Sequence, residues 1–305
     1  MTHQHSHVSL KDPRFTGAFT AITTPFTPGG EAIARDTLQT QVAFQSQGGL
    51  RGIVVSGTTG ESPTLTEVEY KDLVKLAVHH AHTAHLLAIA GTGSNSTAHA
   101  CELQKFAKSI GADATLSLNP YYNEPTQEGL YRHFMAVADA AHIPVVLYNI
   151  PGRSGVTLAP ATVERLNTHQ NIVAIKEATG SLDSATEICM RCPNLALLSG
   201  DDSLTLPFAA VGGVGVVSVV SNILPARVAS LCTAFLEGRW KDALAIHREL
   251  FDFSRAMFVE TNPIPIKAAM RMLGRDTGAL RLPMCDASEA TAAAVRKALT
   301  AQGLL

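Results

Sequence analysis

The segment Ile172-Val173-Ala174-Ile175-Lys176-Glu177 is the strongest indication of the fold: four apolar residues run directly into a lysine and a glutamate. A continuous apolar run of this length is typical of a strand buried on both faces, because a half-exposed strand alternates polar and apolar residues. Comparable runs recur along the chain. The strands expected on this basis cover residues 17–23, 52–56, 86–90, 114–119, 144–148, 172–176, 196–199 and 214–220.

The segments between these runs carry apolar residues at helical spacing, for example at 66–79, 98–110 and 126–140. Eight strands, each followed by a helix, predict an α/β fold of the (β/α)8 type, a TIM barrel. A doubly wound sheet is the main competitor, but it would usually place a glycine-rich turn after the first strand. The chain has Thr23-Thr24-Pro25-Phe26 at that point, which favours the barrel.

The chain beyond residue 239 has a helical pattern, with candidate helices at 242–257, 265–273 and 288–299. We therefore predict a flexible N-terminal tail at 1–14, a catalytic barrel at 15–238 and a C-terminal helical domain at 239–305.

Composition excludes several classes of protein. Hydrophobic residues make up 46% of the chain, charged residues 16%, and the formal net charge is −2. These values fit a packed globular protein with no excess of basic residues for nucleic acid or an anionic membrane. The longest apolar run, near 211–220, is interrupted by glycines and is too short to span a bilayer. A cytoplasmic protein is expected.

The active site of a TIM barrel lies at the carboxyl ends of its strands, so the residues there carry the functional prediction. Lys176 ends the sixth strand behind apolar residues. Burial removes solvation from a charged amine and favours the free amine, which can attack a ketone to form an imine. The alternative is a structural ion pair with Glu177 or another acid of the barrel.

Three further signals stand at neighbouring strand ends. The turn Gly57-Thr58-Thr59-Gly60 offers backbone amides and two hydroxyls to a carboxylate, although a plain strand-to-helix turn has the same composition. Tyr148 precedes Lys176 by one strand and could move a proton, or simply pack in the core. Arg153, in a Pro-Gly-Arg turn, suits a second carboxylate, or is merely solvated. Together they indicate a site for a keto acid and a second anionic substrate.

These residues resemble the dihydrodipicolinate synthase/N-acetylneuraminate lyase superfamily, and in particular its dihydrodipicolinate synthase branch. The resemblance covers about residues 17–305. Its motifs are Gly57-Thr58-Thr59-Gly60-Glu61-Ser62, Pro120-Tyr121-Tyr122-Asn123, Tyr148-Asn149 with Arg153, Ile175-Lys176-Glu177-Ala178-Thr179-Gly180, Ser199-Gly200-Asp201-Asp202 and Arg281-Leu282-Pro283-Met284.

The resemblance implies a lyase that condenses pyruvate with L-aspartate 4-semialdehyde through an imine on Lys176, the first committed step of diaminopimelate and lysine biosynthesis. It implies a hydroxyl relay of Tyr148, Thr58 and Tyr122, with Tyr122 supplied by the neighbouring subunit of a tight dimer. Thr59 would hold the pyruvate carboxylate and Arg153 the carboxylate of the semialdehyde, while backbone near Gly200 and Val217 would line the pocket. A homotetramer, built as a dimer of tight dimers, is expected, with no metal and no organic cofactor.

The regulatory site of lysine-inhibited members is where the sequence departs from the family. The chain keeps Ser62, Asn95 and Tyr121, but has His99 where those members have a glutamate. The two histidine positions carry Glu67 and Tyr70. A histidine is a poor partner for the ammonium of lysine. We therefore predict weak or absent feedback inhibition by lysine.

Two other functions remain open at this point. A pyruvate-dependent class I aldolase or lyase of the same superfamily could act on a different aldehyde. Arg153 argues against this, because sialic-acid lyases and many sugar-acid aldolases lack an arginine in that turn. A non-enzymatic keto-acid or amino-acid binding protein on the same fold would form no imine.

Overall fold

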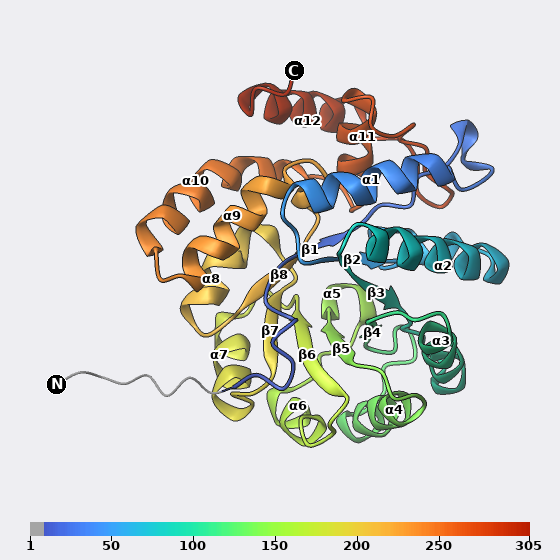
Figure 1. Ribbon diagram of the computed structural model, residues 1–305, viewed down its shortest axis with the longest axis vertical. Coiled ribbons are helices and arrows are strands. Elements are labelled where there is room, and N and C mark those ends of the chain that lie inside the picture. The colour runs from blue at the N-terminus through green and yellow to red at the C-terminus, as the bar shows by residue number, and fades with distance from the viewer. Residues whose placement is uncertain (1–8) are drawn as a thin grey trace.

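The computed structural model describes residues 9–305 and forms a closed barrel of eight parallel strands, in which the last strand pairs with the first (Figure 1). Every predicted strand overlaps an observed one, so the predicted fold class is confirmed. The strands are β1 Gly17–Ala21, β2 Gly52–Val55, β3 Leu87–Gly91, β4 Ala114–Leu118, β5 Val145–Asn149, β6 Ile172–Glu177, β7 Ala196–Ser199 and β8 Gly215–Ser218.

Helices surround the strands as an outer ring (Figure 1). Those of the barrel are α1 Arg35–Gln47, α2 Glu67–Thr83, α3 Thr97–Ser109, α4 Gln127–Asp139, α5 Pro151–Ser154, α6 Pro160–Leu166, α7 Leu182–Arg191, α8 Thr205–Ala210 and α9 Pro225–Leu236. The start of α2 is well defined by sequence, because Thr66 and Glu69 form a reciprocal capping box. The helix continues past the predicted end at residue 79, to Thr83.

The three predicted C-terminal helices are also confirmed as α10 Trp240–Ala256, α11 Ile264–Met272 and α12 Glu289–Ala301. Figure 1 shows α11 and α12 beside α1, at one side of the barrel. One apolar cluster includes Leu38 of α1, Leu73 of α2, Ile266 of α11 and Leu299 of α12, all fully buried. The helical region therefore shares a core with the barrel helices that it covers.

The predicted tail falls partly outside the described residues, which begin at residue 9. Within the described part, Lys11 Nζ donates hydrogen bonds to the carbonyl oxygens of His169 and Ile172, at 3.1 and 3.0 Å. Phe15 is buried against the interior cluster of the barrel. The boundaries proposed for tail, barrel and helical domain remain predictions.

The interior of the barrel is filled by side chains that alternate along the strands. Its buried members include Phe19, Val54, Ile89, Leu116, Val146, Ala174, Leu198 and Val217. Because side chains of a strand alternate between its two faces, Lys176 lies on the same inner face as Ala174, and Ile175 faces the helices.

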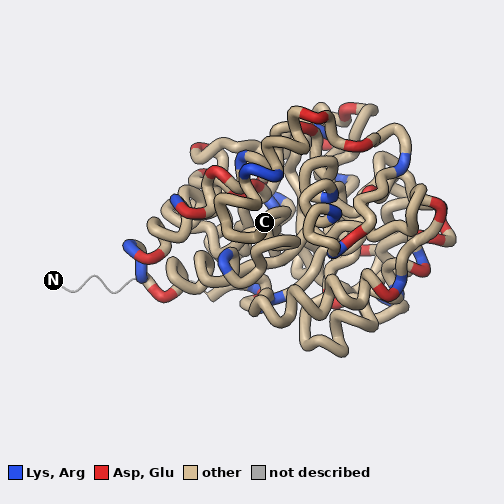
Figure 2. Tube along the Cα trace, turned by 90° about the horizontal axis from the view of Figure 1, so that it is seen from above, with Lys and Arg blue, Asp and Glu red and all other residues tan. Residues whose placement is uncertain are grey.

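Charged residues of both signs are interspersed along the described chain (Figure 2). No helix within residues 9–305 has the length and apolar character needed to cross a membrane.

Candidate active site

Lys176 and Tyr148 are neighbours across two strands inside the barrel. They are paired in the register of β5 and β6, and Lys176 Nζ lies 4.0 Å from the centroid of the Tyr148 ring. Both residues are buried, at 6% and 5% exposure. Packing over an aromatic face holds a buried amine in one place, and the phenol of that ring is a candidate to exchange protons at this site.

Glu177 is not the partner of Lys176. It is fully buried on the opposite face of β6, where its carboxylate accepts hydrogen bonds from Asn149 Nδ2 and from the amide of Thr179, both at 2.9 Å. Burial raises the pKa of Glu177. The structural ion pair left open by the sequence is therefore not formed with this residue, and Lys176 is left facing the barrel interior.

Asp201 is an acid that interacts electrostatically with Lys176. Burial raises the pKa of Asp201, and the charge of Lys176 opposes this shift. The next residue, Asp202, is tied to the end of β8, because its carboxylate accepts hydrogen bonds from Ser218 Oγ and from the amides of Val219 and Val220.

The turn that follows β2 presents its two threonines in different ways. Hydrogen bonds from the amide of Gly60 to the carbonyl of Gly57 and from the amide of Glu61 to the carbonyl of Thr58, both 3.1 Å, close the turn. Thr58 borders a cavity, whereas Thr59 is buried and its hydroxyl accepts a hydrogen bond from Asn262 Nδ2 at 2.9 Å. The turn is therefore closed by its own backbone and tied to Asn262 through Thr59.

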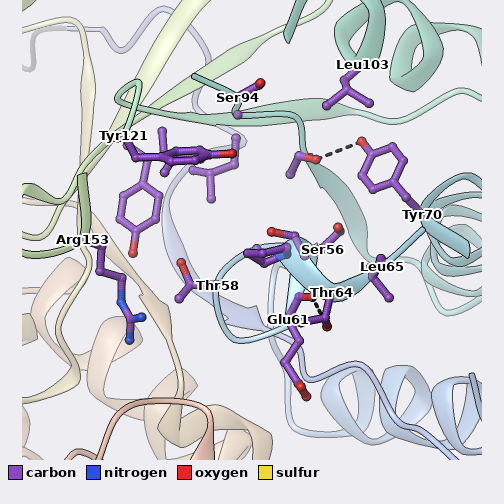
Figure 3. Close-up of a pocket in the computed structure, with 18 of the residues that line it drawn as sticks. Ser56, Thr58, Glu61, Thr64, Leu65, Tyr70, Ser94, Leu103, Tyr121 and Arg153 are labelled. Carbon is purple, nitrogen blue, oxygen red and sulfur yellow. Dashed lines mark hydrogen bonds between the residues drawn. The ribbon is translucent and has the colours of Figure 1, made fainter. Parts of the chain in front are cut away.

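Arg153 stands in the short helix α5, after β5. One of its terminal nitrogens donates to the carbonyl oxygen of Asn262 at 3.0 Å. This uses one of the five N–H groups of a guanidinium, so the fork retains donors for an anion. Arg153 and Thr58 border the same cavity (Figure 3).

That cavity has a volume of about 500 Å³. Its lining includes Thr58, Tyr148, Arg153 and Asn262. Lys176 does not line it in the described chain, but contacts it through Tyr148, whose ring both borders the cavity and packs on Nζ. The phenol, the threonine and the arginine predicted from sequence thus border one cavity, and the amine packs on the ring of that phenol.

Gly200 and Val217 belong to the barrel wall rather than to the lining of this cavity, within the residues described. The amide of Gly200 donates to the carbonyl of Glu177 at 2.8 Å. A Cβ at this position would lie 2.5 Å from Cβ of Ala178, so glycine is required by the close approach of the residues that directly follow β6 and β7. Val217 is fully buried on β8. Their predicted role in lining the substrate pocket remains a prediction.

Tyr122 lies away from the cavity of its own chain. Its side chain is 91% exposed, and its backbone is in the left-handed region, with φ of 74°. A tyrosine in this conformation is strained. Its neighbour Tyr121, by contrast, lines the cavity (Figure 3).

Three of the four predicted regulatory residues also border this cavity: Ser62, His99 and Tyr121. Asn95 does not, and its carbonyl accepts a hydrogen bond from Asn123 Nδ2 at 2.9 Å. Glu67 lines the cavity as well, but Lys71 Nζ lies 2.5 Å from its carboxylate. This hydrogen bond lowers the pKa of Glu67.

Sequence reasoning missed the contribution of the C-terminal region to the site. The sequence analysis assigned no functional role to the segment 259–265, yet Asn262 contacts both Thr59 and Arg153. Lys267 was not singled out either, and it is fully buried against Glu61. The signal was present, since Lys267 stands within the apolar segment of α11, much as Lys176 ends an apolar strand.

Relatives of known name match nearly the whole chain. A protein of Citrifermentans bemidjiense named 4-hydroxy-tetrahydrodipicolinate synthase is 49% identical over 92% of this chain and 96% of its own length. A protein of Geobacter sulfurreducens with the same name is 50% identical, over 90% of this chain and 94% of its own length.

Solved structures of dihydrodipicolinate synthases also match nearly the whole chain. The 4-hydroxy-tetrahydrodipicolinate synthase of Methylacidiphilum fumariolicum matches with a TM-score of 0.92 and 44% identity, over 94% of this chain and 96% of that one. The lysine-bound enzyme of Cyanidioschyzon merolae matches with a TM-score of 0.93 and 40% identity, over 96% and 99% of the two chains. The model of the dihydrodipicolinate synthetase family matches residues 14–302. The chain therefore belongs to the dihydrodipicolinate synthetase family.

Proposed function

We propose that this protein is a lyase that condenses pyruvate with L-aspartate 4-semialdehyde to form 4-hydroxy-tetrahydrodipicolinate. The observation that carries the proposal is the contact of Lys176 with Tyr148: the buried amine lies 4.0 Å from the centroid of the Tyr148 ring, and this tyrosine borders a cavity together with Thr58 and Arg153. Relatives about half identical to the chain bear the name of this activity.

The reaction starts when the free amine of Lys176 attacks the ketone carbon of pyruvate. The carbinolamine loses water, and the product is a protonated imine that draws electrons from the neighbouring methyl group. We assign the protonation of the departing hydroxyl to Tyr148, and the contact of its ring with Nζ supports this role. Loss of a methyl proton then gives an enamine.

The enamine carbon forms the new carbon–carbon bond with the aldehyde, whose oxygen takes up a proton and becomes the hydroxyl of the product. The α-amine of the same substrate then attacks the imine carbon and displaces Lys176, which closes the ring and frees the enzyme. One water is released for each pair of substrates. The remaining donors of Arg153 suit the semialdehyde carboxylate, and Thr59 with the amides of its turn suits the carboxylate of pyruvate. Thr58 is assigned to the hydroxyl relay with Tyr148 and Tyr122.

We assign Tyr122 to the active site of a partner subunit in a tight dimer. Its nearly complete exposure and strained backbone support this role. Strained backbone is concentrated at functional sites, and within its own chain this side chain is almost fully exposed. Mixing a Tyr122→Ala chain with a Lys176→Ala chain tests the assignment. Heterodimers would contain one intact site, so activity should reappear in the mixture; a mixture as inactive as its components would refute it. The tetramer and the cytoplasmic location are proposed from the family resemblance.

The test of the overall function is an assay of pyruvate consumption with a panel of aldehydes. Consumption that requires L-aspartate 4-semialdehyde supports the proposal. Consumption with another aldehyde only would assign the chain to a different pyruvate lyase, and no consumption with any aldehyde, together with no imine, would leave a binding protein.

A further inference from the structure

A buried ion pair joins the C-terminal helices to the turn that carries Thr58 and Thr59. Lys267 Nζ lies 2.6 Å from Glu61 Oε1, and the two side chains are 0% and 2% exposed. Lys267 belongs to α11, whereas Glu61 directly follows the Gly57-Thr58-Thr59-Gly60 turn. A pair this deeply buried is seldom the most stable choice for a core, because both charges lose their hydration.

The surroundings of the pair compensate both charges. Lys267 Nζ also donates to the carbonyl of Thr24 at 2.9 Å and lies 4.4 Å from the centroid of the Phe26 ring. The second oxygen of Glu61 accepts from the amide of Arg281 at 3.1 Å. In the observed geometry, the amine of Lys267 and both carboxylate oxygens of Glu61 therefore all have a partner.

The backbone of Glu61 connects the ion pair to the turn that carries Thr58 and Thr59. Glu61 has a φ of 53°, a left-handed conformation that a glutamate rarely adopts without a compensating contact. Its amide closes the turn on the carbonyl of Thr58. Thr24, the second acceptor of Lys267, donates its hydroxyl to the carbonyl of Gly60 at 2.6 Å.

The same helix region also reaches the substrate side of the turn. Asn262, just before α11, donates to the hydroxyl of Thr59 and accepts from Arg153. The turn is thus held from two sides by one segment, at Thr59 by Asn262 and at Glu61 by Lys267.

We propose that Lys267 is a positioning residue for pyruvate: its ion pair with Glu61 fixes the left-handed end of the turn and so aims the hydroxyl of Thr59 and the turn amides at the pyruvate carboxylate. The inference rests on the proposed function and adds a residue that touches no substrate. It differs from a purely structural role, because it predicts a defect in the use of pyruvate that persists when the fold is intact.

The test uses a double variant, because either single change leaves an uncompensated buried charge and destabilises the fold. Glu61→Gln with Lys267→Met removes both charges, keeps an oxygen for the amide of Arg281, and should fold with a thermal midpoint near that of the parent. We expect the KM for pyruvate to rise about ten-fold or more, since small misplacements of binding groups have effects of this order. The KM for the semialdehyde should stay within about two-fold.

A matched control lies on the same helix. Arg271 and Asp286 form an ion pair at 3.1 Å with side chains 47% and 65% exposed. The double variant Arg271→Met with Asp286→Asn should keep the parental KM for both substrates, because exposed pairs contribute little.

The outcomes separate the two proposals. A Glu61→Gln/Lys267→Met protein that folds and has the parental KM for pyruvate overturns the inference while the proposed function stands. One that does not fold also overturns it, because the pair is then a requirement of the fold. A parent protein that forms no borohydride-trapped adduct with pyruvate overturns the proposed function and, with it, the inference.

Discussion

Replacement of Tyr148 by phenylalanine removes the proposed proton relay while keeping the ring on which Lys176 Nζ packs, 4.0 Å from the centroid. The variant loses one hydroxyl at the cavity wall, so the free energy of unfolding should change by no more than about 1 kcal/mol, the usual worth of one hydrogen bond. A positioned acid–base group contributes about 100- to 10,000-fold to a rate, which is about 3 to 5 kcal/mol of activation free energy.

We therefore expect kcat to fall by at least about 100-fold, measured by pyruvate consumption in the presence of L-aspartate 4-semialdehyde. Thermal melting checks that the fold is kept. Tyr131→Phe is the matched control, because this tyrosine packs under Arg165 at 3.8 Å, on the outside of the barrel. A folded Tyr148→Phe protein with kcat within about three-fold of the parent would refute the relay, since no acid–base contribution of the expected size could then be present.

Three further predictions follow from the same geometry. Arg153→Ala should raise the KM for the semialdehyde by about ten-fold or more, the usual loss for a charge-assisted contact, and leave the trapping of pyruvate by borohydride unchanged; a change confined to pyruvate would contradict the assignment. L-Lysine should inhibit weakly or not at all, because His99 stands where an ammonium needs a carboxylate and Glu67 is already paired with Lys71; a low-micromolar inhibition constant would contradict this. Burial lowers the pKa of His133 from 6.5 to about 4, so the unfolded chain takes up this proton first and the free energy of unfolding should decrease as pH falls from 6.5 towards 4. His133→Gln should reduce that slope in pH-dependent urea denaturation, and an unchanged slope would show that the histidine does not contribute.

The fold could be predicted from the sequence because its strands are buried on both faces. Runs such as Ile172-Val173-Ala174-Ile175 have no polar position to alternate with, and eight of them separated by helical segments leave few arrangements. The neighbourhood of Lys176 and Tyr148 was also accessible, since both stand at the carboxyl ends of consecutive strands and the observed register places them side by side.

The contacts of the C-terminal helices could not be predicted in this way. Asn262 and Thr59 are separated by 203 positions, and no local pattern of residues encodes which face of the barrel a distant helix will cover. The ion pair of Lys267 with Glu61 depends on the same packing. The left-handed backbone of Tyr122 could not be predicted for a different reason. A tyrosine adopts this conformation because of its surroundings and not because of its own conformational preference.

The central claim is that Lys176 is the nucleophile, and reduction with borohydride in the presence of pyruvate, followed by peptide mapping, tests it most directly. The chain has a second buried lysine, Lys267, which serves as an internal comparison because its amine already contacts Glu61 and the carbonyl of Thr24. The account predicts a stable pyruvate adduct on the peptide containing Lys176 and none on that containing Lys267. An adduct on Lys267, or no adduct on either peptide, would contradict it.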